Sequence, residues 1–133
     1  MNKRLLLLLT VGALSLAGWI GIATAQTSRA TREVMRTKLD HSQKALEGVT
    51  AGDFEILLAA AKKLKALGSA QDWPNFDNPE YQEHKANFRR SVNALERGAV
   101  EANLDSATLA YVRMTMNCVE CHRFVRGKKL AAL

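Results

Sequence analysis

Two cysteines and a histidine stand close together near the C-terminus of this 133-residue chain. Cys118, Cys121 and His122 form the pattern C-x-x-C-H. In a helix these residues are at positions i, i+3 and i+4, which share one face. Two thiols at this spacing can add to the two vinyl groups of a porphyrin, and the adjacent imidazole can bind the iron. The motif therefore predicts one covalently attached haem c with His122 as the proximal iron ligand.

Three other uses of a C-x-x-C pair compete with haem attachment. A redox dithiol follows a strand in a βαβ unit, but the apolar residues upstream of Cys118 have helical spacing. A structural zinc site needs a second pair of closely spaced ligands, and the other two histidines, His41 and His84, are solitary. A disulfide between Cys118 and Cys121 is the alternative that stays open.

The N-terminus has the pattern of a secretory signal peptide. Lys3 and Arg4 precede an apolar stretch over residues 5–22, and Ala23-Thr24-Ala25 is a small-x-small cleavage site. We expect residues 1–25 to be removed, which leaves one domain over residues 26–133 and predicts a periplasmic protein. An uncleaved membrane anchor is the alternative, because the apolar stretch approaches the length that spans a bilayer.

Composition limits the classes of partner. Lys3 and Arg4 leave with the signal peptide, so 17 of the 19 basic residues remain against 13 acidic ones. This balance does not favour nucleic-acid binding, and the one basic cluster, residues 123–129, is typical of a solvated helix C-terminus. The sequence also lacks a convergent carboxylate pair, a Ser/His pair and a glycine-rich phosphate loop. We therefore expect no enzymatic activity.

Apolar residues at helical spacing predict an all-α protein with four helices. The first covers about residues 28–49, and a capping box from Thr50 to Asp53 opens the second, which Gly68 closes. A loop over residues 69–77 holds Trp73 and Phe76. The inward faces of these two helices are predicted to carry Met35, Leu39, Ser42, Leu46 and Val49, then Phe54, Leu57, Ala61, Leu64 and Leu67.

The third and fourth helices follow after the loop. Asn78 caps the third, with Pro79 at its first position, and Asp105 is predicted to cap the fourth. Their predicted inward faces carry Tyr81, His84, Phe88, Val92, Leu95 and Ala99, then Leu109, Val112, Met116 and Val119. His84 shares the inward face and could reach the haem, but we expect it to be buried and to bond a backbone carbonyl. Met114 is expected to be a packing residue.

Short connections favour antiparallel neighbours, so we predict an up-down-up-down four-helix bundle with the haem attached near the end of the fourth helix. In this topology the start of the first helix and the end of the fourth lie at the same end. At about 1.5 Å of rise per residue, Met35 and His122 reach comparable heights. The far face of the haem would then be turned towards Met35 and Leu39.

The chain resembles the class II c-type cytochromes, the family that includes the cytochromes c′. The resemblance rests on Cys118, Cys121, His122 and the basic Arg126, in a chain of four predicted helices. The family usually has an aromatic residue three places after the haem histidine, where this sequence has Val125, with Phe124 one place earlier. Arg126 matches the basic residue that follows, so the resemblance implies a haem contact for it.

Members of this family differ in the residue that faces the iron from the first helix. A methionine gives a six-coordinate electron carrier, whereas a leucine or phenylalanine leaves an iron that binds nitric oxide or carbon monoxide. Met35 is the predicted distal ligand, and Leu39 is the alternative haem contact over an open site. We therefore expect a mono-haem cytochrome that carries single electrons between redox proteins, with gas binding as the alternative. The sequence leaves open whether two bundles form a homodimer.

Overall fold

The computed structural model describes residues 29–69 and 78–131, and within these ranges it contains only helices and turns. Residues 29–51 form the first helix, followed by α2 (Phe54–Ser69), α3 (Pro79–Val100) and α4 (Leu104–Ala131). The all-α prediction is confirmed for this part of the chain. The predicted signal peptide, Trp73 and Phe76 lie outside the described residues.

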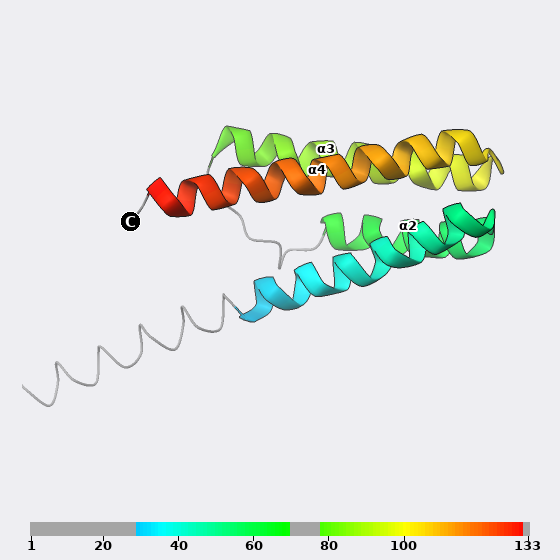
Figure 1. Cartoon of the computed structure of the whole chain (residues 1–133), viewed down its shortest axis with the longest axis horizontal. Helices are drawn as coiled ribbons and strands as arrows, with labels where there is room; N and C mark the ends of the chain where they lie inside the picture. The colour runs from blue at the N-terminus through cyan, green and yellow to red at the C-terminus, as the bar shows by residue number, and fades with distance from the viewer. Residues whose placement is uncertain (1–28, 70–77, 132–133) are drawn as a thin grey trace, which may run out of the picture. The chain divides into compact units, whose positions relative to one another are not determined.

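A compact unit extends from Val34 to the C-terminus, and we call its first helical segment, residues 34–51, the N-terminal helix. Two-residue and three-residue turns reverse the chain before α2 and before α4, so each helix pair is antiparallel. α3 packs against both α2 and α4 (Figure 1). This arrangement is compatible with an up-down-up-down bundle. The largest fully buried side chains, which form its core, are Leu57, Leu64, Val92, Leu95 and Met114.

The two turns have the same construction. Each helix ends in a Schellman motif: Asp53 N donates to Gly48 O at 2.9 Å, and Asn103 N donates to Gly98 O at 2.9 Å. The residue before each donor has a positive φ, 65° at Gly52 and 49° at Ala102. The same donors then cap the following helix through their side chains, since Asp53 Oδ1 accepts from Ile56 N and Asn103 Oδ1 from Ser106 N.

The left-handed conformation of Ala102 predicts a stabilising substitution. The left-handed conformation costs a non-glycine residue roughly 1–2 kcal/mol of folding free energy. A change to glycine removes this cost, but glycine also makes the unfolded chain more flexible, which offsets part of the gain. We expect Ala102→Gly to raise the free energy of unfolding by about 0.5–1 kcal/mol in urea titrations. The matched change Gly52→Ala should lower it by a similar amount, and a loss of stability in Ala102→Gly would contradict this account.

The structure corrects three predicted helix boundaries, two of them at these turns. Thr50 does not open α2, because its hydroxyl donates to Leu46 O and Glu47 O within the first helix. Asn103, and not Asp105, caps α4. Gly68 does not end α2 but lies buried inside it, where an added Cβ would be 3.3 Å from the Phe88 ring. The predicted cap of α3 is confirmed, since Asn78 accepts from Tyr81 N and Pro79 begins the helix.

The predicted inward face is confirmed for α3 and wrong for α4. Tyr81, Phe88, Val92, Leu95 and Ala99 are buried and His84 is half-buried. On α4 the buried residues are instead Ala107, Ala110 and Met114, and the four residues predicted to point inward, Leu109, Val112, Met116 and Val119, are exposed. The N-terminal helix likewise buries Ala45 and Gly48 and exposes Leu39 and Leu46. The N-terminal helix therefore turns small residues towards its neighbours, and α4 turns two alanines and Met114.

Candidate functional site

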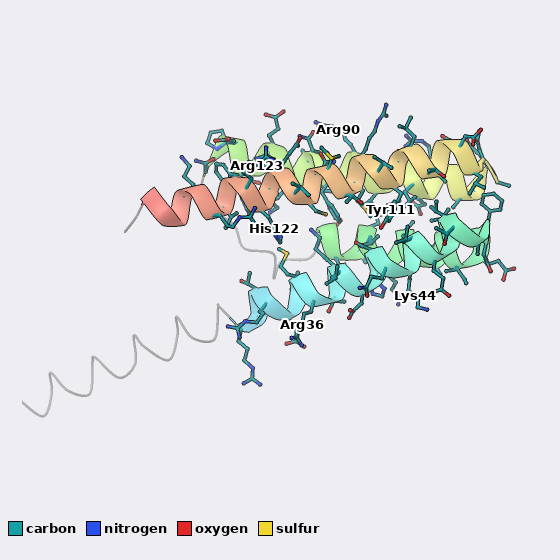
Figure 2. All side chains as sticks on the ribbon, in the orientation of Figure 1. Arg36, Lys44, Arg90, Tyr111, His122 and Arg123 are labelled. Atoms are coloured by element: carbon teal, nitrogen blue, oxygen red, sulfur yellow. The ribbon has the colours of Figure 1, made fainter. Side chains whose placement is uncertain are left out.

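The C-x-x-C-H motif lies in the second half of α4, on the side that faces the N-terminal helix. Cys118 and Cys121 are free thiols, both half-buried, and His122 is exposed. All three border a cavity of about 220 Å³ between α4 and the N-terminal helix. Tyr111 and His122 point from α4 towards this helix, whereas Arg123 points away from it (Figure 2). The helix thus presents both thiols and the imidazole to one cavity.

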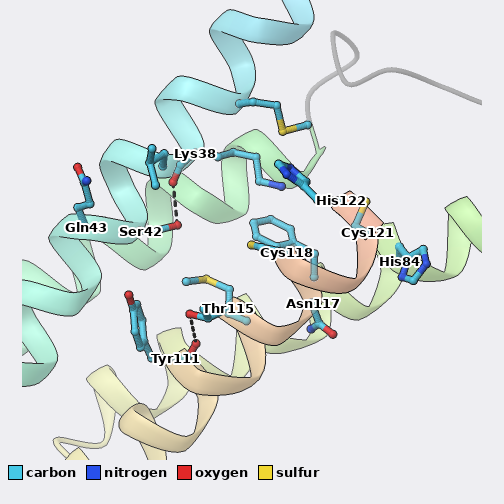
Figure 3. A pocket seen from close by; sticks show the side chains of 14 residues that line it. Lys38, Ser42, Gln43, His84, Tyr111, Thr115, Asn117, Cys118, Cys121 and His122 are labelled. Atoms are coloured by element: carbon cyan, nitrogen blue, oxygen red, sulfur yellow. Dashed lines mark hydrogen bonds between the residues drawn. The ribbon is translucent and has the colours of Figure 1, made fainter. Parts of the chain in front are cut away.

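The N-terminal helix supplies the opposite wall through Met35, Lys38, Leu39 and Ser42. Lys38 reaches furthest into the site, where its side chain extends towards Cys118 and His122 (Figure 3). Its Nζ lies 3.7 Å from the centre of the Phe88 ring, a cation–π contact. Met35 is half-buried, while Leu39 is 57% exposed and stands at the rim. The wall opposite the motif therefore combines the apolar side chains of Met35 and Leu39 with three polar groups, the Lys38 ammonium, the Ser42 hydroxyl and the Gln43 amide.

Burial and charge shift the pKa of Lys38 and of the three side chains that the motif presents to the cavity, Cys118, Cys121 and His122. Burial lowers the pKa of Lys38 to about 8 from its usual 10.5, against the attraction of the two thiols. Burial raises the pKa of Cys118 and of Cys121, and the Lys38 charge partly opposes both shifts. Burial, Lys38 and Arg126 together lower the pKa of His122. Near neutral pH the imidazole is thus held in the uncharged form that binds metals.

Thiol reactivity gives a direct test of this electrostatic arrangement. In the haem-free chain, Lys38→Met should slow the alkylation of Cys118 and Cys121, because loss of the ammonium removes the charge that favours their thiolates. Iodoacetamide labelling followed by peptide mass spectrometry would measure the two rates at constant pH. Lys44→Met is the matched control, since Lys44 is exposed on the same helix and pairs with Glu47. Faster labelling in Lys38→Met would contradict the arrangement.

α3 holds the motif in place from its other side. Asn117 Nδ2 donates to Asn87 O at 3.1 Å and to Ser91 Oγ at 2.7 Å, and Ser91 is buried. One turn beyond Cys121, Phe124 packs against α3 with its ring centre 6.5 Å from that of Tyr81. These contacts before and after the two cysteines set the rotation of α4, so that the thiols face the cavity.

His84 differs from its expected structural role. Its ring nitrogens are both buried and have no hydrogen-bond partner among the described residues, so the predicted bond to a backbone carbonyl is wrong. The ring lies 5.4 Å from that of Phe124 and borders the cavity beside Cys118 and Cys121. Buried polar groups without a partner are rare in proteins and are often satisfied by a bound molecule. His84 is therefore an independent indication that a ligand completes this site.

The structure brings Met35, Leu39, Cys118, Cys121 and His122 together around the cavity. Arg126 is exposed and close enough to His122 for its charge to lower the pKa of the imidazole. Sequence reasoning missed Lys38 and Asn117, because charged and amide residues normally mark the solvated face of a helix. The one available indication was helical spacing, because residues three or four positions apart share a helix face. Lys38 is four residues from Ser42, and Asn117 is three residues from Met114.

The donor set fits a c-type haem. Two free thiols and a neutral imidazole share one helix face, the walls are mostly apolar, and His84 has buried nitrogens without a partner. The cavity is smaller than the roughly 300–1,000 Å³ of pockets that enclose drug-sized ligands. The residues present therefore fit the group by their chemistry and not by the volume of the cavity. In the described ranges, no three His, Cys, Asp or Glu residues cluster in a way that could hold a metal ion.

In the described part of the chain, no helix combines the length and the apolar character needed to span a bilayer. Comparisons with protein-family models, with curated protein sequences and with solved structures find no match to this chain.

Proposed function

We propose that this protein is an exported mono-haem c-type cytochrome that carries single electrons between redox proteins. The observation that carries the proposal is the shared face of Cys118, Cys121 and His122, turned towards a mostly apolar cavity. The haem would supply the one-electron chemistry of its iron. The protein's own residues would bond the haem through two thiols, bind the iron through His122 and keep water from the ring.

Met35 is the proposed distal ligand. Its thioether suits the iron of an electron carrier, and it comes from the helix opposite the motif. Leu39 is the alternative residue over an open site, but its 57% exposure places most of its side chain outside the cavity. These two observations favour a six-coordinate electron carrier over a protein that binds nitric oxide or carbon monoxide.

Two measurements on the exported protein test the proposal in sequence. Acid-acetone extraction should leave the colour on the polypeptide, whereas pigment in the organic layer would exclude covalent attachment. The haem-loaded ferric protein should then show the weak near-infrared band of sulfur-ligated haem.

The change Met35→Ala should abolish this band and allow carbon monoxide to bind the ferrous form. Leu39→Ala is the matched control and should keep the band. A wild-type protein that is high-spin and binds carbon monoxide would instead support the gas-binding alternative.

A further inference from the structure

Lys38 places an ammonium group inside the candidate site. It lies three residues after Met35 and four before Ser42, so all three share the face of the N-terminal helix that borders the cavity. Its side chain extends from that helix towards Cys118 and His122 on α4 (Figure 3). Lys38 is half-buried, although an ammonium group is strongly hydrated in water. The N-terminal helix therefore directs a positive charge into the space that the motif borders.

A buried aromatic ring from α3 holds the ammonium group in this position. Lys38 Nζ lies 3.7 Å from the centre of the Phe88 ring, the distance of a cation–π contact. Phe88 is only 3% exposed, so its ring is fixed by the close-packed core of the bundle. Exposed lysine side chains instead extend their charge into water. The Phe88 ring thus gives the charge of Lys38 a defined place inside the protein.

The charge of Lys38 acts on the residues that would bind the haem. It opposes the rise that burial causes in the pKa of both cysteine thiols. It also lowers the pKa of His122, and it does so more strongly than the exposed Arg126. A charge that is partly removed from water acts through a lower effective dielectric constant, and salt screens it less. Lys38 is therefore placed to influence any group that His122 binds.

We propose that Lys38 raises the reduction potential of the haem that the C-x-x-C-H motif would bind. Reduction moves one electron from a donor redox protein to ferric iron and leaves ferrous iron, so the site gains one negative charge. An ammonium group beside the proximal imidazole attracts that charge and favours the reduced form. This inference rests on the proposed function and names a residue that determines how readily the carrier accepts electrons.

The change Lys38→Gln should lower the reduction potential, because glutamine removes the charge and adds no sulfur ligand. We expect the equilibrium constant for reduction to fall about tenfold, which for a one-electron couple is about 59 mV. Lys38→Arg keeps the charge and the cation–π contact, and should stay within about threefold of the wild type. Spectroelectrochemical titration at pH 6 measures both variants, since Lys38, with a pKa of about 8, is charged there.

Lys44→Gln is the matched control for the loss of one positive charge. Lys44 lies six residues further along the same helix, where it is exposed and pairs with Glu47. Its removal should change the equilibrium constant by less than about threefold, because water screens the charge. Circular dichroism confirms that each variant keeps its helical content.

The seat on Phe88 gives a second test. Phe88→Leu should also lower the potential, because the ammonium group can then move into water. The same change should have no further effect when residue 38 is already glutamine, so the two effects are not additive. An equal effect of Phe88→Leu in both backgrounds would overturn the role of the ring.

Ionic strength separates a charge inside the site from one at the surface. The Debye length falls from about 10 Å in 0.1 M salt to about 3 Å in 1 M salt, which screens exposed charges. The difference in potential between the wild type and Lys38→Gln should therefore persist in 1 M salt at roughly its value in 0.1 M salt. A difference that disappears would show that the ammonium group lies in solvent once haem is bound, and would overturn the proposal.

The haem is checked first in each variant, so that the two proposals fail separately. Acid-acetone extraction tests covalent attachment, and the ferric absorption spectrum shows whether the iron ligands match those of the wild type. A wild type without covalent haem would overturn the proposed function and this inference together. A haem-loaded protein in which Lys38→Gln raises the potential, or lowers the equilibrium constant by less than about threefold, would overturn this inference alone. So would a shift that accompanies a change of iron ligand.

Discussion

Replacing Cys118 and Cys121 by alanine should remove all covalently attached haem from the exported protein, from one haem per chain to none. The reason is chemical, since no other cysteine exists in the sequence to form a thioether with the porphyrin. Both thiols also face the cavity beside His122. Haem staining after denaturing electrophoresis and intact-protein mass spectrometry would measure the loss.

The same variant should also be less stable. The fully buried large side chains include Leu57, Leu64 and Leu95, whereas the residues that border the cavity are mostly half-buried. That region lacks apolar contacts that a porphyrin would supply. We expect the melting temperature to fall by about 10 °C or more, which for a domain of this size corresponds to roughly 2 kcal/mol.

A control separates the two effects. Thr115→Ala changes an exposed residue on the rim of the same cavity, and should keep both the covalent haem and the melting temperature. Covalent pigment in the double cysteine variant would refute thioether attachment through these residues. An equally stable variant without haem would show that the cofactor is peripheral to folding.

The second large effect is expected at Gly98, where the backbones of α3 and α4 lie close together next to their turn. A Cβ at this position would lie 2.8 Å from Ala107 N and 2.9 Å from Ala107 Cα. These atoms belong to the backbone of α4, so the helices must separate to admit a side chain. We expect Gly98→Ala to lower the free energy of unfolding by about 1–3 kcal/mol, and Gly98→Val to lower it further.

Gly127 provides the matched control for this prediction. Gly127 likewise lies within a helix, α4, but an added Cβ there would have nothing within 4 Å. Because alanine is the better helix former, Gly127→Ala should be neutral or should stabilise the protein by up to about 1 kcal/mol. Urea titrations would measure both variants. A neutral or stabilising Gly98→Ala would contradict the close approach of the helices.

Gly48 gives an independent check, because the first turn repeats the second. A Cβ at Gly48 would lie 2.8 Å from Leu57 N. Each glycine is nine residues before the residue that its backbone approaches. The helix that contains each glycine ends with the same pair of backbone hydrogen bonds. This equivalence between two turns of different sequence was not predicted, since Ala102 gives no indication of a positive φ.

Local chemistry could be predicted well from the sequence. Asn78 and Pro79 begin α3 as expected, because a cap depends on a side chain and a backbone donor only three residues apart. The spacing of Cys118, Cys121 and His122 likewise depends on one helix, and it predicted that the three residues share one face, which in the structure borders a cavity. Asp105 was a wrong cap because the helix already begins at Leu104, where Asn103 accepts from Ser106 N once the preceding turn is formed.

The sequence by itself thus determined the helical class, the start of α3 and the group of residues that could attach a haem, because these depend on neighbours within one or two turns. Only the tertiary structure decided which side of α4 is buried, because both sides of that helix are apolar and hydrophobic spacing does not distinguish them. It also decided that Lys38 lies against the thiols and that His84 is buried without a partner. Those features depend on how separate helices pack, and the close approach at Gly48 and Gly98 determines that packing.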